Sequence, residues 1–140
     1  ADKRFVKNGF LRSGEVRANA LEMIERFDIR PPDPNARTGS LSGGNRQKVI
    51  LARELSLGAK VVVAAEPTRG LDVGAISTIR RALAAVREEG GAVLLISTDL
   101  DEVLELSDRV AVLHGGRVMG LEDAAPFDRQ QIGSWMAGVE

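Results

Sequence analysis

The sequence contains no cysteine and only one histidine, His114, among its 140 residues. Without cysteine the chain cannot form a disulfide or a thiolate metal site, which suits a reducing cytosol. A single imidazole cannot build a metal cluster. The position of His114, directly before two glycines, indicates a surface role beside a turn. We therefore predict that this chain holds no metal ion of its own.

Long apolar runs and an excess of one charge are also missing. No apolar stretch approaches the roughly 20 residues needed to span a bilayer, and no secretory leader is visible. The net charge is −1, with acids and bases interspersed, so no basic footprint for nucleic acid is present and we expect no nucleic-acid partner. The length and the 44% apolar content fit part or all of one globular unit with a single core.

Helix and strand patterns alternate along the chain. Apolar residues recur at helical spacing over 15–27, and a second helix should run from Ser42 to about Leu57. Continuous β-branched runs at 61–65 and 92–96 are typical of strands buried on both faces of a parallel sheet. The amphipathic pattern over 76–86 lies between them, so this segment predicts a right-handed βαβ unit.

The last third of the sequence predicts a short helix at 100–106 and then an antiparallel hairpin, with strands at 109–113 and 117–120. A final amphipathic helix contains Trp135, which we expect to be a core or docking residue rather than a platform for a ligand. The fold class is therefore α/β, a mostly parallel sheet with flanking helices plus an N-terminal helical segment. Three prolines near residue 32 form a stiff connector. We predict a helical subdomain over 1–58 and an α/β core over 59–140.

One segment, Leu-Ser-Gly-Gly-Asn-Arg-Gln-Lys at 41–48, has the pattern of an anion site. Ser42 can cap the helix, while Gly43 and Gly44 leave backbone N–H groups bare at its positive end. Alone, such a cap is more often structural. A second segment, Glu-Pro-Thr-Arg-Gly-Leu-Asp at 66–72, follows the first buried strand and changes that interpretation.

Together these segments resemble the signature sequence, the Walker B end and the D-loop of an ABC-transporter ATPase. The longer stretches 41–55, 66–75, 96–109 and 136–138 resemble the second ATPase module of tandem ABC importers, which serve simple sugars such as ribose, or nucleosides, in bacteria. The resemblance therefore covers nearly the whole chain.

The phosphate loop of that family, G-x-x-x-x-G-K-[ST], does not occur in this sequence. The nearest run, Gly9 to Gly14, is followed by Glu15, and a carboxylate is electrostatically wrong where the phosphate-binding lysine should stand. We interpret this run as accidental. The chain thus resembles the C-terminal part of a nucleotide-binding domain, after its phosphate loop.

In that family two modules enclose two ATP molecules, each held between the phosphate loop of one module and the signature of the other. The resemblance implies that Ser42, Gly43, Gly44 and Asn45 contact an ATP held by the opposite module. It also implies ATP and Mg²⁺ as cofactors of the complete transporter, with none bound to the isolated chain. The expected partners are a preceding nucleotide-binding module and membrane permease subunits, at the cytoplasmic face of the cell membrane.

The chain departs from the family pattern at two positions. Ala65 stands where the Walker B aspartate should hold Mg²⁺, and Thr98 stands where the switch histidine should face the γ-phosphate. Glu66 keeps the general-base position but is expected to be impaired, whereas the D-loop residue Asp72 is retained. The residues that serve the module's own ATP are therefore damaged, and those offered across the dimer are intact.

We accordingly predict a fragment of the energising subunit of a sugar or nucleoside importer, with a degenerate site of its own. The parent protein is expected to be an ATPase, and the isolated chain is expected to be inactive. The alternative is a non-catalytic docking module that keeps the fold and binds no nucleotide. A soluble ABC ATPase outside transport is a third interpretation. Sequence upstream of this chain would distinguish them.

Overall fold

The computed structural model describes residues 5–139. The chain divides into two compact units. One comprises the residues up to Val62 together with Pro67–Ala92, and the other comprises Val63–Glu66 together with the residues from Val93 onward. The predicted boundary between 58 and 59 stays a prediction.

The first unit begins with a small hairpin, in which β1 (Val6–Lys7) pairs with β2 (Phe10–Leu11) in antiparallel register. Asn8 and Gly9 form its turn with φ values of 52° and 82°, as in the type I′ turns that suit hairpins. This hairpin was not predicted. Because Gly9 lies in its turn, the Gly9–Gly14 run does not form a strand–loop–helix, in agreement with its interpretation as accidental.

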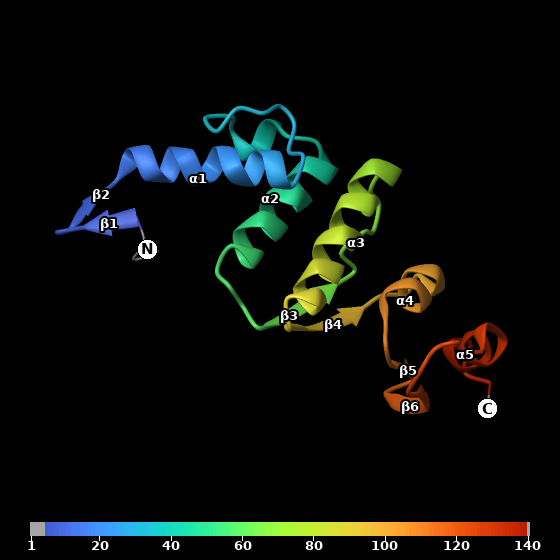
Figure 1. Cartoon of the computed structure of the whole chain (residues 1–140). Helices are drawn as coiled ribbons and strands as arrows, with labels where there is room; N and C mark the ends of the chain where they lie inside the picture. The colour runs from blue at the N-terminus through green and yellow to red at the C-terminus, as the bar shows by residue number, and fades with distance from the viewer. Residues whose placement is uncertain (1–4, 140) are drawn as a thin grey trace. The chain divides into compact units, whose positions relative to one another are not determined.

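Helices make up most of the first unit (Figure 1): α1 (Ser13–Arg26), α2 (Gly43–Leu55) and α3 (Val73–Glu88). These bounds confirm the predicted helices, and α2 packs against α3. The core lies at the end of α1 and along α2. Its buried members are Phe27, Ile29 and Ala52, and the apolar side chains packed on them are Met23, Ile24, Val49, Leu51, Leu55 and Ala82.

The strands β3 (Val61–Ala65) and β4 (Ala92–Ile96) pair as a two-stranded sheet and have the predicted bounds. Near their starts the Ala92 N–H donates to the Lys60 carbonyl, at 2.8 Å. Just past their ends the Glu66 N–H donates to the Ile96 carbonyl, at 2.7 Å. The two strands therefore run in the same direction, with α3 between them in the chain, as expected for a βαβ unit.

The prediction that these strands are buried on both faces is wrong. Val61, Val63, Leu94 and Ile96 are 51–66% exposed, whereas the residues that alternate with them are buried or half-buried. A continuous apolar run shows that both faces are suited to burial. It cannot show whether a covering element exists, and no segment of residues 5–139 covers this face.

The second unit contains α4 (Leu100–Leu106), the antiparallel hairpin of β5 (Val110–His114) and β6 (Arg117–Glu122), and α5 (Arg129–Met136). Each was predicted to within a few residues. The helix α5 packs on both strands of the hairpin. The core consists of Val110, Val112 and Ile132, with Leu100, Val103, Leu104, Met119, Phe127, Trp135 and Met136 packed around them.

Trp135 lies directly over Gly120. A Cβ at Gly120 would stand 2.5 Å from the indole ring, closer than packed atoms can approach, so only glycine allows this contact. Of the two roles predicted for Trp135, core or docking, the structure shows packing against the core of this unit. His114 is exposed, as predicted, and its Nδ1 lies 3.1 Å from the Met136 carbonyl oxygen.

Candidate functional site

Ser42 caps α2 as predicted. Its backbone is extended, and its Oγ accepts a hydrogen bond from the Asn45 N–H at 3.4 Å. The first intrahelical bond, from the Arg46 N–H to the Ser42 carbonyl, measures 2.9 Å. The N–H groups of Gly43 and Gly44 belong to the first turn, where a helix offers no acceptor of its own. They lie at the positive end of the helix, where backbone N–H groups can bind an anion.

The two glycines have different surroundings. Gly43 is exposed, and a Cβ built on it would meet nothing within 4 Å. Gly44 is buried, and its Cβ would stand 3.1 Å from the Ala75 Cβ and 3.2 Å from Asp72 Oδ2. Gly43 therefore faces open space, where a ligand can approach the backbone. Gly44 lets the start of α2 lie close against α3.

Asp72 caps α3, because its Oδ1 accepts the Ala75 N–H at 2.9 Å. Its other carboxylate oxygen faces Gly44. The structure thus brings the predicted D-loop residue against the predicted signature segment within one unit. The sequence patterns did not predict this contact. The small residue at position 75 was a sequence signal for close helix packing, although small residues are common in helices.

Asn45 connects Ser42 to the connector that follows α1. Its Oδ1 accepts the Arg30 main-chain N–H at 2.7 Å, and its Nδ2 donates to Ser42 Oγ at 3.0 Å. A backbone N–H can only donate, so the first contact fixes which end of the Asn45 amide faces Ser42. With two donors on its oxygen, the Ser42 hydroxyl is left to donate its own proton. It is therefore suited to an acceptor such as a phosphate oxygen.

A second contact supports the same connector. The Lys48 side chain, 8% exposed, donates from Nζ to the Asp28 carbonyl oxygen at 2.9 Å. A hydrogen bond from Arg30 holds the pKa of the Asp28 carboxyl below its ordinary value, and the charges of Arg30 and Lys48 act in the same direction. These contacts tie the turn after α1 to α2, which carries the signature segment.

The predicted catalytic positions lie at the ends of β3 and β4. Ala65 and Thr98 are exposed, and Glu66 is half-buried. Glu66 has a left-handed backbone, with φ of 47°. Its Oε1 accepts the Thr98 N–H at 3.0 Å. The structure therefore places the predicted general-base residue beside the predicted switch residue, but the contact goes to the Thr98 main chain.

These residues do not fit a nucleotide and metal held by this chain alone. The Ala65 methyl group cannot bind Mg²⁺, which requires oxygen ligands. Within residues 5–139 no group of three or more histidine, aspartate or glutamate side chains is placed to hold a metal ion. The first turn of α2 fits one anionic group presented to it from outside.

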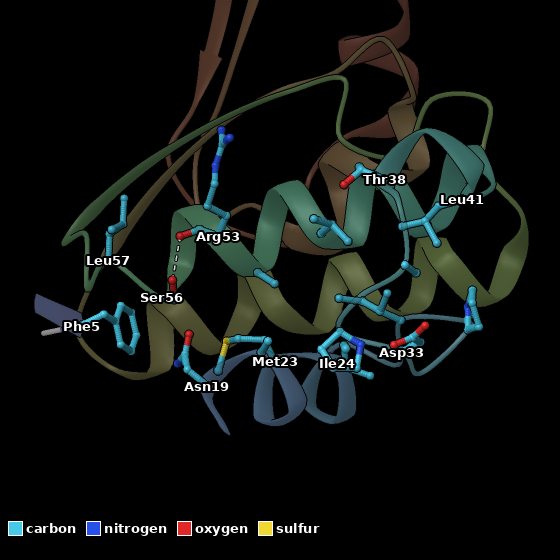
Figure 2. A pocket seen from close by; sticks show the side chains of 17 residues that line it. Phe5, Asn19, Met23, Ile24, Asp33, Thr38, Leu41, Arg53, Ser56 and Leu57 are labelled. Atoms are coloured by element: carbon cyan, nitrogen blue, oxygen red, sulfur yellow. Dashed lines mark hydrogen bonds between the residues drawn. The ribbon is translucent and has the colours of Figure 1, made fainter. Parts of the chain in front are cut away.

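An apolar cavity of about 390 Å³ lies in the first unit, between α1, α2 and the connector (Figure 2). Met23 and Ile24 line it from α1, and Leu41 lines it from the connector. At its rim the Ser56 hydroxyl donates to the Arg53 carbonyl at 2.8 Å. None of the predicted site residues lines this cavity, so it is not the predicted nucleotide site.

Across residues 5–139, every helix is too short or too polar to cross a bilayer.

No protein-family model matches the chain. Among curated proteins, the chain is 44% identical over 132 residues to the nucleoside import ATP-binding protein NupA of Lactococcus lactis, and the match covers 94% of this chain and 26% of that protein. It is 46% identical over 139 residues to the glucose import ATP-binding protein TsgD13 of Haloferax volcanii, covering 98% and 25%. The chain thus spans about a quarter of the length of these relatives.

Among solved structures, the chain is similar to the dimeric ATP-binding cassette MJ0796 in a post-hydrolysis state bound to ADP and Pi. The TM-score is 0.72 at 26% identity, and the match covers 86% of this chain and 52% of that one. The fold is therefore part of an ABC ATPase cassette. By sequence, the chain matches a partial domain of ATP-binding proteins from sugar and nucleoside importers.

Proposed function

We propose that this chain is part of the ATP-binding subunit of an ABC importer for a sugar or a nucleoside. We further propose that the first turn of α2 completes, in trans, an ATP site whose phosphate loop belongs to a partner module. Ser42, Gly43 and Gly44 would contact the γ-phosphate, with Asn45 beside them and Asp72 in the D-loop. The chain's own site is degenerate at Ala65 and Thr98, an arrangement that impairs Glu66.

The observation that carries this proposal is the open first turn of α2. Gly43 has empty space where a side chain would stand, and the network around Asn45 leaves the Ser42 hydroxyl as a donor. Both features suit a phosphate, because N–H and O–H groups aimed at one point stabilise negative charge. They also favour a nucleotide-binding role over a docking module that binds no nucleotide.

The names of the relatives support the proposed transported class, since one imports nucleosides and another imports glucose. The known cassette dimer, bound to ADP and Pi, supports a two-module arrangement. We therefore propose a preceding nucleotide-binding module and membrane permease subunits as partners. ATP and Mg²⁺ would act in the assembled protein at the inner face of the cell membrane, and the isolated chain would bind neither.

The test is the Gly43→Asp variant in the complete importer. A carboxylate would occupy the open space beside the phosphate and repel it in a site closed to water. We expect at least a roughly ten-fold loss of ATP turnover, equivalent to about 1.4 kcal/mol. ATP affinity of the partner module should largely persist, because the phosphate loop supplies most contacts. Ser42→Arg removes the helix cap and fills the space beside Gly43 with a bulky side chain. We expect it to have the same effects on ATP turnover and ATP affinity.

Gly39→Asp is the matched control, because Gly39 is also exposed with nothing within 4 Å of its Cβ position, but it lies outside α2. It introduces the same charge near the same helix. Near-normal turnover in Gly43→Asp would show that the signature segment is vestigial, and the docking module would then be the better explanation. An equal loss in both variants would indicate a general effect of charge and would not support a phosphate contact.

A further inference from the structure

We propose that Glu66 is a positioning residue, which holds the main chain at Thr98 against the end of β3 and does not act as the base that activates water. The main chain and the side chain of Glu66 each make a hydrogen bond to the end of β4 and the loop after it. Its N–H donates to the Ile96 carbonyl at 2.7 Å, and its Oε1 accepts the Thr98 N–H at 3.0 Å.

The backbone of Glu66 supports this role. Its φ of 47° lies in the left-handed region. A residue other than glycine is disfavoured in this region by about 1–2 kcal/mol. Such a conformation persists only where the surroundings fix it. The two hydrogen bonds to Ile96 and Thr98 are those surroundings.

The contact with Thr98 determines how the chain enters α4. The Asp99 N–H donates to Ser97 Oγ at 3.1 Å, and Asp99 Oδ1 accepts the Asp101 and Glu102 N–H groups at 2.9 and 3.2 Å. These bonds make the cap of α4 continuous with the loop that Glu66 holds. Because α4 contributes to the core of the second unit, fixing Thr98 also orients that helix.

The neighbours of Glu66 do not equip it as a base. Ala65 offers no metal ligand, and Thr98 offers no imidazole beside the γ-phosphate. The orientation of the Glu66 carboxylate is set by an amide of its own chain. This inference rests on the proposed function in one respect, namely that the chain's own ATP site is degenerate.

The direct test is hydrogen exchange of the Thr98 amide in the full 140-residue chain, comparing wild type with Glu66→Gln and Glu66→Ala. Thr98 is exposed, so the bond to Glu66 is its expected source of protection. Gln keeps the accepting oxygen, and exchange should stay within about three-fold of wild type, whereas Ala should accelerate it at least about ten-fold. Equal exchange rates in wild type and Glu66→Ala would overturn the proposal.

Glu66→Gly keeps the test usable if Glu66→Ala does not fold. Glycine removes the side chain but tolerates the left-handed backbone. Exchange of the Thr98 amide should accelerate in Glu66→Gly as much as in Glu66→Ala. We expect this even if glycine makes the fold more stable, because both variants lack the accepting carboxylate. Slow exchange at Thr98 in a folded Glu66→Gly variant would show that the carboxylate is not the acceptor that matters.

A functional readout separates positioning from base catalysis in the assembled importer. A base is lost equally in Glu66→Gln and Glu66→Ala, whereas a positioning residue is largely replaced by Gln. We expect ATP turnover in Glu66→Ala to be at least about five-fold below that in Glu66→Gln. Equal rates in the two variants, both low or both high, would overturn the proposal. The Gly43→Asp result tests the proposed function separately, because Gly43 takes part in neither of the two hydrogen bonds of Glu66.

Discussion

The first turn of α2 and the ends of β3 and β4 use their polar groups in opposite ways. At α2, hydrogen bonds within the chain leave the Ser42 hydroxyl and the Gly43 N–H available to a ligand. At the strand ends, the Glu66 carboxylate and the Thr98 N–H are bonded to each other. The first turn of α2 thus leaves donors open to the surroundings, whereas the donor and acceptor at the strand ends are paired with each other.

On the proposed function, this difference would explain how one half of a nucleotide site is retained while the other half is lost. The contribution of α2 depends on backbone groups and on packing that α3 also requires, since Gly44 and Asp72 are in contact. The contribution of the strand ends depends on individual side chains. Under this proposal, a single change such as alanine at position 65 would remove a metal ligand and leave the strand β3 intact. Four predictions test this comparison.

The largest effect is expected for Asn45→Asp in the complete importer. Aspartate still accepts the Arg30 N–H but presents an acceptor to Ser42, so the Ser42 hydroxyl would donate to it and no longer to phosphate. Losing a charge-assisted hydrogen bond worth about 1.5–3 kcal/mol lowers ATP turnover about ten-fold or more.

The charge that Asn45→Asp adds must be separated from this reversal of polarity. The same substitution in a Ser42→Ala background retains the charge and lacks the hydroxyl. We expect Asn45→Asp to have a clearly smaller effect there. The measurement is steady-state ATP turnover. If Asn45→Asp lowers turnover by the same factor with and without Ser42→Ala, the two substitutions act independently and the interpretation of the Asn45 network is wrong.

The next effect concerns the two glycines and is measured as folding stability. Gly44→Ala pushes a methyl group to 3.1 Å from Ala75, and overpacking of this kind costs about 1–3 kcal/mol. Gly43→Ala adds a methyl group in open space and should stabilise the helix by up to about 1 kcal/mol. Chemical denaturation of the isolated chain measures both. Ala75→Gly should recover part of the loss in Gly44→Ala, and a lack of recovery would place the strain elsewhere.

A smaller effect is expected for Ala65→Asp in the complete importer. The new carboxylate restores one oxygen ligand, but Mg²⁺ needs an octahedral set and Thr98 still lacks an imidazole, so turnover should rise less than about two-fold. The double variant Ala65→Asp with Thr98→His is the informative comparison. Full activity in the single variant would show that the strand ends carry one lesion and not two.

The smallest effect should be the pH dependence of the Asp28 contacts. Because the folded pKa of Asp28 lies below its ordinary value of 3.8, its carboxylate stabilises the fold above that value. The stabilisation is lost as the pH falls through the folded pKa. The difference in thermal midpoint between wild type and Asp28→Asn should therefore be constant near neutral pH and vanish in acid. A difference that grows on acidification would contradict this.

Sequence patterns predicted the elements well and their long-range contacts poorly. The strands β3 and β4 and the helix α4 have the predicted bounds. The spacing of apolar residues and the turn residues that define these bounds are close together in the sequence. The contacts from Asn45 to Arg30 and from Glu66 to Thr98 join residues distant in sequence, and no local signal reports them. The Asn8–Gly9 pair is a local signal for a hairpin turn. It was not used as one, because Gly9 was considered only as part of a run that resembles a phosphate loop.

The wrong prediction that β3 and β4 are buried on both faces has a different cause. Their composition correctly indicates faces that suit an apolar neighbour. Whether that neighbour is present depends on other segments, so Val63 and Leu94 remain exposed in residues 5–139. The candidate site was predicted as a set of residues, and the structure adds which of them face outward.

The stacking of Trp135 on Gly120 has a practical consequence for spectroscopy. Trp135 is the only tryptophan in the sequence, and there is no tyrosine. Ultraviolet-excited fluorescence of the chain therefore originates almost entirely from one indole, held against the β5–β6 hairpin. An emission shift on heating reports the loosening of this hairpin and α5, whereas circular dichroism is dominated by the longer helices of the other unit. Recording both signals on one sample shows whether the two units melt together or in succession.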